Sequence, residues 1–476
     1  MSDAAPRVLR ASGSELAQMI RTGEVKSRSV VEAHIDQARR VNPRVNALVA
    51  QRFDTALAEA DRADTAPSEA PFHGVPCTVK ECFALSGMPQ TSGLVSRGGV
   101  VAEADAPAVA LLRAAGAIPL GVTNVSELCM WMEANNRVYG RTRNPYDPAR
   151  TSGGSSGGEA ALVAAGGSPF GIGSDVGGSI RMPAAFCGVF GHKPSPGLVE
   201  NTGQYPNAEN EAQRYLATGP IARSATDLAP LLEVISAVPV GAPDPMSALD
   251  VYLVEPRGIG RIDPEVLSAV RLAAAVLEEN GARVVTAELA ALRHSFDIWS
   301  AMMNAAAGTS FRELLAGGGE LRPGREFVRS ITGRTKFTVP ALGLAAIEAL
   351  PGRVAPGRER RMRELGAVLR DELHELLGPH GVLLYPPYPT VAPRHGRALL
   401  PPVRWAGTAI FNVLDTAVTQ APIGLDRRGL PLGVQIVGMA GTDANTIAVA
   451  RVIEDALGGW APPSARIRVR GPRHCR

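Results

Sequence analysis

The sequence predicts an α/β fold, because strand-like and helix-like segments alternate along most of its 476 residues. One helix should begin at residues 105–107, where an aspartate precedes a proline, and run to Gly116 before the strand-like segment AIPLGVT. Another should begin at residues 263–265 and end at residues 280–281, before the strand-like segment ARVVTAEL. With 45% hydrophobic residues, a chain of this length can bury a substantial core.

One segment interrupts this alternation. The residues from about Ala301 to Arg358 are rich in glycine, arginine and methionine and lack the regular succession of strands and helices. Neither a fixed-period repeat nor a long proline- or serine-rich linker divides the chain. We therefore expect a single domain over residues 1–476, with a helical insertion at about 301–358 that acts as a cap over the substrate.

Charge and composition exclude several classes of function. The net charge is only +3 and the basic residues are scattered, so we expect no nucleic-acid partner. The arginine-rich end, SARIRVRGPRHCR, is expected to be a solvated terminus. No run of about 18 uncharged apolar residues occurs, and residues 1–20 lack the features of a signal peptide. These observations predict a cytoplasmic protein with no membrane partner.

The cysteines indicate a reducing compartment rather than a disulfide framework. The chain has an odd number of them with no close C-x-x-C pair, at positions Cys77, Cys82, Cys129, Cys187 and Cys475. His73, Cys77 and Cys82 could form part of a metal site, but no second cluster of ligands matches them. We therefore expect neither a metal nor another cofactor.

The rarity of lysine makes Lys80 informative. Of the 49 lysine and arginine residues only four are lysines, so arginine fills nearly every general surface role. Lys80 lies in GVPCTVKECFAL, a segment typical of a buried strand or its end. Burial among apolar residues favours the neutral form of a lysine, whereas an arginine cannot be deprotonated. The presence of a lysine at position 80 therefore calls for a specific explanation.

The glycine- and serine-rich stretch TSGGSSGGEAALVAAGG, residues 151–167, allows several interpretations. A flexible linker is disfavoured because a small-residue helix follows at once, and a phosphate-binding loop would need a lysine and a hydroxyl that are missing. The pattern G-x-S-x-G occurs at both Ser155 and Ser156, as in the nucleophile elbow of α/β-hydrolases. That elbow requires a preceding strand, whereas RTRNPYDPART is typical of a loop, so the elbow stays an alternative.

A second glycine-rich block, GIGSDVGGSIRMPAAFCG, contains Ser179 directly after Val176, Gly177 and Gly178. A helix-compatible run follows. Backbone amides in a glycine turn at a helix start can converge on one point and stabilise an oxyanion. A plain turn with a capping serine is the alternative interpretation.

Together, Lys80, Ser155 and Ser179 and the block TSGGSSGGEAALVAAGGSPFGIGSDVGGSIRMPAAFCGVFGHKPS resemble the amidase signature family of serine hydrolases, most closely its fatty-acid-amide-hydrolase-like branch. The resemblance extends from about Ser12 to Leu457 and is strongest between His73 and Asp227. It implies a large mixed β-sheet flanked by helices, as an α/β/α sandwich. Both the residue types and their long spacings agree with the family.

The resemblance also implies a role for each residue of a Ser–cis-Ser–Lys triad. Neutral Lys80 would accept the proton of Ser155, Ser155 would accept that of Ser179, and Ser179 would attack the carbonyl. The peptide bond from Gly154 to Ser155 would be cis. The oxyanion hole would be formed by the backbone amides of Val176, Gly177, Gly178 and Ser179. Positions that match supporting residues of the signature are Ser156, Asp175, Arg181 and Cys187.

The substrate is less well defined by the sequence. Cys129 matches a channel-lining position of the family, and Met130 and Trp131 continue it as an apolar run, which is also typical of ordinary core. We expect a small-molecule substrate, an apolar acyl or aryl amide, with ester and carbamate (urethane) cleavage by the same residues. The alternative within the fold is the glutamine-amidase subunit of an amidotransferase. The sequence leaves a homodimer open.

Overall fold

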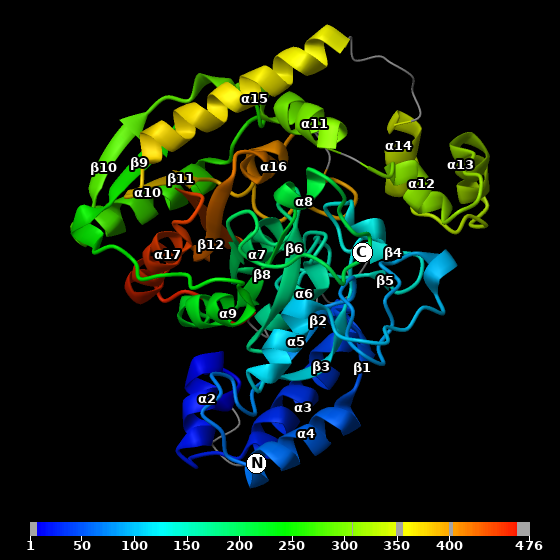
Figure 1. The fold of residues 1–476 in the computed structure, drawn as a ribbon, viewed down its shortest axis with the longest axis vertical. Helices are drawn as coiled ribbons and strands as arrows, with labels where there is room; N and C mark the ends of the chain where they lie inside the picture. Colours follow the sequence, from blue (N-terminus) through cyan, green and yellow to red (C-terminus); the bar gives the residue numbers. More distant parts are fainter. Residues whose placement is uncertain (1–6, 307, 349–355, 399–402, 464–476) are drawn as a thin grey trace, which may run out of the picture.

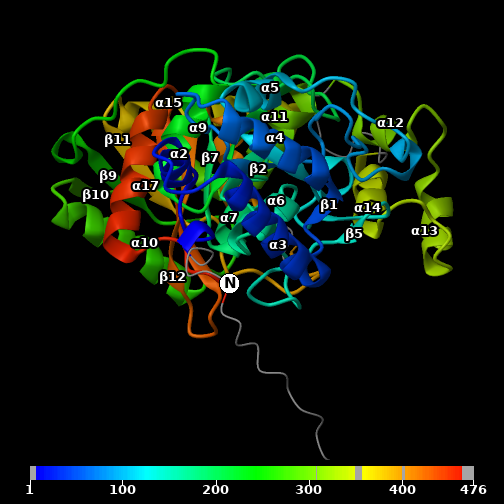
Figure 2. The same ribbon diagram turned by 90° about the horizontal axis from the view of Figure 1, so that it is seen from below.

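The computed structural model describes residues 7–306, 308–348, 356–398 and 403–463. Within these residues an 11-stranded mixed sheet runs through the molecule in the order β1-β3-β2-β6-β8-β7-β12-β13-β11-β9-β10 (Figure 1). Seen after a 90° turn, β9, β7, β2 and β1 follow one another across the molecule with helices on either side (Figure 2). The large mixed sheet flanked by helices that the sequence predicts is confirmed.

Parallel and antiparallel pairs alternate in blocks along the sheet. The strand β2 lies parallel to both β3 and β6, and β9 lies parallel to both β10 and β11, whereas the strands between these blocks pair antiparallel. The strands are β1 (Leu48–Gln51), β2 (Pro76–Lys80), β3 (Ile118–Thr123), β6 (Phe170–Asp175), β7 (Phe190–Lys193), β8 (Ala217–Ala222), β9 (Asp250–Val254), β10 (Arg283–Ala287), β11 (Gly381–Tyr385), β12 (Thr416–Leu425) and β13 (Pro431–Met439). A small separate sheet pairs β4 (Asn135–Asn136) with β5 (Gly140–Arg141).

Both faces of the sheet are buried, and β11 shows how. Its residues Val382 and Leu384 belong to the core beneath α5, α9, α10 and α17, while Leu383 and Tyr385 belong to the core beneath α11, α15 and α16. Side chains of a strand point alternately to opposite faces, so a strand covered on both sides is apolar throughout. The helices are α2 (Gly13–Arg21), α3 (Ser27–Val45), α4 (Phe53–Thr65), α5 (Pro107–Ala114), α6 (Gly157–Ala164), α7 (Arg181–Cys187), α8 (Ala212–Tyr215), α9 (Leu228–Ile235), α10 (Pro264–Glu279), α11 (Ser295–Ala306), α12 (Phe311–Ala316), α13 (Pro323–Ile331), α14 (Val339–Glu348), α15 (Pro356–Leu377), α16 (Ala406–Val413) and α17 (Asp443–Leu457).

The two helix starts expected from the sequence form for different reasons. Asp263 caps α10 as predicted, because its carboxylate accepts a hydrogen bond from the backbone amide of Glu265 at 3.1 Å. Asp105 does not cap α5. It forms an ion pair with Arg113 at 2.6 Å, and the α5 cap position is the extended Ala106. Both strands expected after these helices are present, as β10 and β3.

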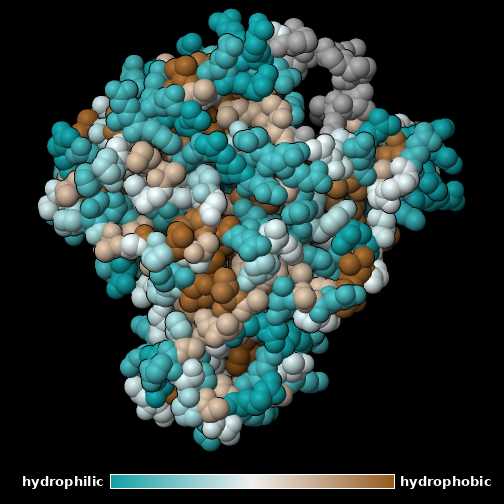
Figure 3. All heavy atoms as spheres, in the orientation of Figure 1, coloured by the Kyte–Doolittle hydropathy of each residue, from teal (hydrophilic) through white to brown (hydrophobic). Residues whose placement is uncertain are grey.

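The segment that interrupts the alternation carries α12, α13 and α14, which lie together at one side of the sheet (Figure 1). Leu315 and Leu342 of this group pack in a small core of their own with Leu94 and Leu128 of the main body. On the face shown in Figure 3, apolar residues gather across the middle of the molecule, and the outer rim is mostly hydrophilic. The role of the segment as a cap stays a prediction.

Two further expectations concern the ends and surface of the chain. The arginine-rich end at 464–476 lies outside the described residues. Among the helices that the structure describes, none combines the length and the apolar character needed to cross a bilayer.

The helix α15 offers a matched test of the packing. Leu373 is fully buried against the sheet, whereas Val368 on the same helix is 51% exposed. We expect Leu373→Ala to lower the free energy of unfolding by about 2–5 kcal/mol, because it removes buried methyl groups and leaves a cavity. Val368→Ala should change it by less than about 0.5 kcal/mol. Chemical denaturation of both variants would measure this, and equal losses would contradict the described orientation of α15.

Candidate active site

The side chain of Lys80 ends in the interior, at the carboxyl end of β2, which lies between β3 and β6. It is fully buried, and its Nζ lies 2.7 Å from Ser155 Oγ and 2.9 Å from Ser174 Oγ. A third contact, of 3.4 Å, joins Nζ to the carbonyl oxygen of Ser174. None of these partners is a carboxylate. The hydrogen-bond partners of the amine are therefore all neutral oxygens.

Ser155 lies in the loop before α6, and the peptide bond from Gly154 to Ser155 is cis. Gly154 is required by close packing, because a Cβ there would lie 2.4 Å from the carbonyl oxygen of Trp131. The loop is held against its neighbour by a hydrogen bond from the backbone amide of Ser156 to the carbonyl oxygen of Ser179, 3.2 Å long. Cys187 also supports this loop, since its thiol donates to the carbonyl oxygen of Ser152.

Ser179 follows a turn that leads from β6 into α7. The Asp175 carboxylate accepts hydrogen bonds from the amides of Gly178 at 2.7 Å and Ile180 at 3.0 Å, which fixes the turn on both sides of Ser179. Gly178 has a φ of +98°, a conformation that favours glycine. The Ser179 side chain is only 8% exposed.

Of the four amides predicted to form an oxyanion hole, Gly178 differs from the others. Its N–H already donates to Asp175. The amides of Val176, Gly177 and Ser179 have no acceptor among the described residues. Three N–H donors are therefore without a protein acceptor among the described residues, and the fourth anchors the turn.

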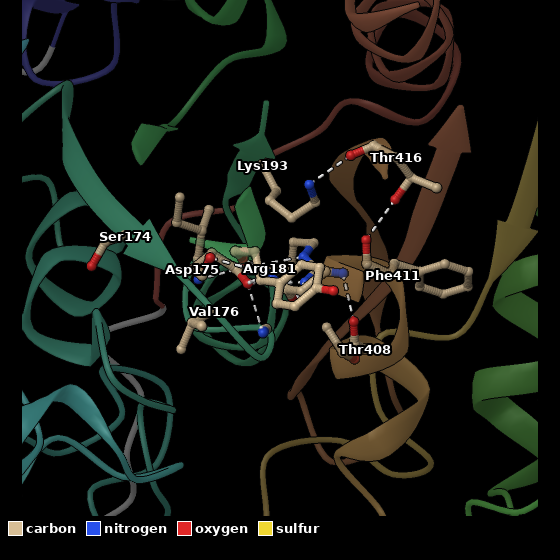
Figure 4. Close-up of polar contacts among 12 residues, drawn as sticks. Ser174, Asp175, Val176, Arg181, Lys193, Thr408, Phe411 and Thr416 are labelled. Carbon is tan, nitrogen blue, oxygen red and sulfur yellow. Dashed lines mark hydrogen bonds and ion pairs between the residues drawn. The ribbon is translucent and has the colours of Figure 1, made fainter. Parts of the chain in front are cut away.

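Behind the turn, Asp175 and Arg181 form a fully buried ion pair with a 2.9 Å contact (Figure 4). Burial opposes ionisation of Asp175, but the Arg181 guanidinium outweighs it and holds the pKa of that carboxyl well below its usual range. Arg181 also donates to the carbonyl oxygen of Thr408 and to the side-chain oxygens of Asn412 and Gln435. The turn is thereby tied to α16 and β13. The sequence indicated Asp175 and Arg181, but not their distant partners.

A second buried lysine, Lys193, has a structural position. Its Nζ donates to the carbonyl oxygens of Pro194 at 2.9 Å and Thr416 at 2.6 Å, joining β7 to β12 (Figure 4). Burial and the nearby Arg181 lower the pKa of Lys193 to about 8. Unlike Lys80, it contacts no serine hydroxyl among the described residues.

The residues predicted to bind substrate diverge in the structure. Cys129 is half-buried and its thiol lies 3.5 Å from the hydroxyl of Ser92. Met130 packs against the small core shared with α12 and α14, whereas Trp131 packs against a different cluster that includes Met182 and Tyr388. The apolar run therefore contacts the helical insertion through Met130 and the start of α7 through Trp131.

Two buried carboxyls near the site were not indicated by the sequence. Glu159 on α6 accepts hydrogen bonds from the hydroxyls of Thr78 and Thr123, and burial raises its pKa to about 7. Glu81, next to Lys80, accepts from the Thr91 hydroxyl, and burial raises its pKa to about 7 as well. Because Glu159 stands within a run of alanines and glycines, no local pattern indicates that its side chain faces the sheet.

Comparison with known proteins agrees with this geometry. A protein-family model described as Amidase matches residues 29–447. The chain belongs to the amidase family. It is 43% identical to fatty-acid amide hydrolase 2-B of Danio rerio over 96% of this chain and 91% of the relative. It is 42% identical to fatty-acid amide hydrolase 2 of Homo sapiens, with the same two coverages.

Solved structures agree in fold. A structure of 6-aminohexanoate cyclic dimer hydrolase complexed with substrate superimposes with a TM-score of 0.78 at 28% identity, covering 94% of this chain and 97% of that one. This member of the amidase family is thus a hydrolase that cleaves amide bonds. The alternative nucleophile elbow gains no support, because isolated bridges at Arg150 and Thr151, rather than a strand, precede the loop.

The raised pKa of Glu159 predicts a pH dependence of stability. Its pKa is about 7 in the folded chain against an ordinary value of 4.5, so the stability associated with its protonated form is lost as pH rises from about 4.5 through 7. Glu159→Gln cannot ionise. We expect the melting temperature of this variant, relative to the unsubstituted protein, to rise between pH 5 and pH 8 in thermal unfolding. The matched control, Glu278→Gln on the exposed side of α10, should show no such trend.

Proposed function

We propose that the protein hydrolyses amides of apolar acyl or aryl groups through an acyl-enzyme on Ser179. In this proposal Lys80 is the general base and Ser155, in the cis peptide, relays the proton. The observation that carries it is the 2.7 Å contact between Lys80 Nζ and Ser155 Oγ in a fully buried site whose other partners of Nζ are neutral. A base confined in this way needs no histidine.

The proposed reaction begins with two linked proton transfers. Ser155 passes its proton to neutral Lys80 and takes the proton of Ser179, whose oxygen attacks the amide carbonyl. The oxyanion is held by the amides of Val176, Gly177 and Ser179. The C–N bond then breaks, and the proton returns from Lys80 through Ser155 to the leaving amine. Water, deprotonated by the same relay, releases the acid from Ser179.

The relay requires contact between the Ser155 and Ser179 hydroxyls, which are not hydrogen-bonded to each other among the described contacts. The two loops are already joined by the bond between the Ser156 amide and the Ser179 carbonyl. Catalytic hydrogen bonds often become short only when substrate is bound. The side-chain contact is therefore expected to form in the substrate complex.

Apolar surroundings support the proposed substrate class. Met130 and Trp131 pack with leucine, methionine and aromatic side chains, whereas the small polar substrate of a glutamine-amidase subunit would need polar partners. The similar fatty-acid amide hydrolases are named for apolar acyl amides. Because one shuttle can protonate an amine or an alkoxide, we include esters and carbamates among the substrates.

Two further parts of the proposal concern the insertion and the compartment. The Glu127 carboxylate, two residues before Cys129, accepts a hydrogen bond from the amide of Thr338 at the start of α14, 2.8 Å away. This link supports a cap formed by α12, α13 and α14 beside the substrate channel. The four cysteines within the described residues are free thiols, which supports a reducing, cytoplasmic compartment.

The nucleophile can be identified directly. After treatment with a fluorophosphonate, mass spectrometry should find the adduct on the peptide that contains Ser179, because Ser179 stands at the end of the turn that carries the three unpaired amides. Ser179→Ala should remove both the labelling and the hydrolysis of acyl p-nitroanilides. An adduct on Ser155 or Ser156 would contradict the proposed roles and favour the nucleophile elbow.

The base role of Lys80 is tested by a substitution that keeps the charge. Lys80→Arg should lower kcat/KM for an acyl p-nitroanilide by at least about 100-fold, because arginine cannot become neutral to accept a proton. Circular dichroism should establish that the variant is folded. Lys26→Arg, at an exposed lysine, is the matched control and should retain full activity. Turnover near that of the unsubstituted protein by Lys80→Arg would refute the shuttle.

A further inference from the structure

Tryptophans are concentrated around the turn that precedes Ser179. The chain has four of them, and three lie near this turn although they come from distant parts of the sequence. Trp131 follows Cys129 and Met130, Trp299 lies on α11, and Trp405 directly precedes α16. All three are half-buried. The fourth, Trp460, donates its indole N–H to the carbonyl oxygen of Ala164, on α6.

Two of these indoles converge on the turn itself. Trp299 donates its N–H to the carbonyl oxygen of Val176, with a length of 3.1 Å. A Cβ placed on Gly177 would lie 3.4 Å from the ring of Trp299 and 3.6 Å from the ring of Trp405. Both rings therefore stand at contact distance from the backbone whose amides are proposed to hold the oxyanion.

The rings are arranged edge to face. Trp299 and Trp405 have centroids 4.6 Å apart and planes at 89°, and Phe296 meets Trp405 at 5.9 Å and 84°. Trp405 and Trp131 both pack against the cluster that contains Met182, three residues after Ser179. An aromatic surface therefore extends around the start of α7, and its half-buried indoles keep part of their surface exposed. Another ring could meet them in the same edge-to-face pattern.

The chemistry of this surface discriminates between possible occupants. Aromatic rings also attract cations, but the guanidinium of Arg404 already lies beside Tyr388, in the cluster against which Trp131 and Trp405 pack. A positively charged group is thus disfavoured. A flexible alkyl chain would gain burial only, whereas an aromatic ring gains in addition from the quadrupoles of the indoles.

We propose that Trp131, Trp299 and Trp405 form an aryl subsite beside the turn at Val176 and Gly177, and that preferred substrates carry an uncharged aromatic ring close to the scissile amide. This inference rests on the proposed function, because it takes Ser179 as the attacking residue. Trp299 has a second effect as a positioning residue, since its N–H holds the Val176 carbonyl and orients the following amides.

The subsite can be tested with substrates that differ only in ring saturation. One pair is phenylacetamide and cyclohexylacetamide, and the other is butyranilide and N-cyclohexylbutanamide. Trp405→Leu should lower the ratio of kcat/KM for the aryl over the cyclohexyl substrate by about tenfold in at least one pair, and that pair identifies the side of the amide on which the ring binds. Intrinsic reactivity cancels because each substrate is compared between variants.

Two controls make the result decisive. Trp405→Phe keeps a ring and should retain most of the preference. Trp405→Met, which also lacks a ring, replaces Trp405→Leu if that variant does not fold. Trp460→Leu applies the same substitution to the fourth tryptophan and should leave both ratios as in the unsubstituted protein. Ratios that Trp405→Leu, or Trp405→Met in its place, leaves unchanged in both pairs would overturn the subsite while leaving the proposed function intact.

A binding measurement separates failure of the subsite from failure of the proposed function. If the unsubstituted protein hydrolyses none of the four amides, the proposed function fails. The non-hydrolysable ketone 4-phenyl-2-butanone should still bind about tenfold more tightly than 4-cyclohexyl-2-butanone, as followed by tryptophan fluorescence. Trp405→Leu should abolish this difference. Equal affinities of the unsubstituted protein for the two ketones would overturn the subsite.

Discussion

The site depends on the buried ion pair between Asp175 and Arg181. A buried charge pair is tolerated only where further hydrogen bonds satisfy the remaining donors and acceptors, and here Asn412, Gln435 and two backbone amides do so. Asp175 fixes the turn on either side of Ser179, while Arg181 attaches that turn to α16 and β13. One interaction thereby sets both the shape of the turn and its place against the second half of the chain.

Lys80 occupies the opposite kind of environment. The hydrogen-bond partners of its Nζ are two hydroxyls and a carbonyl, whereas the buried Arg181 has the Asp175 carboxylate within reach. The interior thus holds the charged pair of Asp175 and Arg181 where the turn must be rigid. It holds an amine with neutral hydrogen-bond partners, Lys80, where proton transfer is proposed. Glu159 and Glu81 are also buried without a cationic hydrogen-bond partner among the described residues. Burial raises the pKa of each carboxyl to about 7, and hydroxyl groups donate hydrogen bonds to their oxygens.

Local sequence was sufficient for much of the fold and for the centre of the candidate site. Apolar strands, the cap of α10 by Asp263 and the two glycine blocks all depend on residues close together in the chain. Contacts between residues far apart in the chain could not be predicted from local sequence. Asp105 pairs with Arg113 instead of capping α5, the Gly178 amide is taken by Asp175, and Asn412 reaches Asp175 from 237 residues away. Each of these follows from packing between elements, which no local pattern encodes.

The separate small core under α12, α13 and α14 has a consequence for how such enzymes diversify. Its leucines contact Leu94 and Leu128 but take no part in the cores on either face of the sheet. Mutations in the insertion can therefore accumulate without weakening the scaffold that holds the serines and the lysine. Proteins that descend from a common ancestor could change the set of amides they accept through substitutions in α12, α13 and α14, while the residues of the candidate site stay the same.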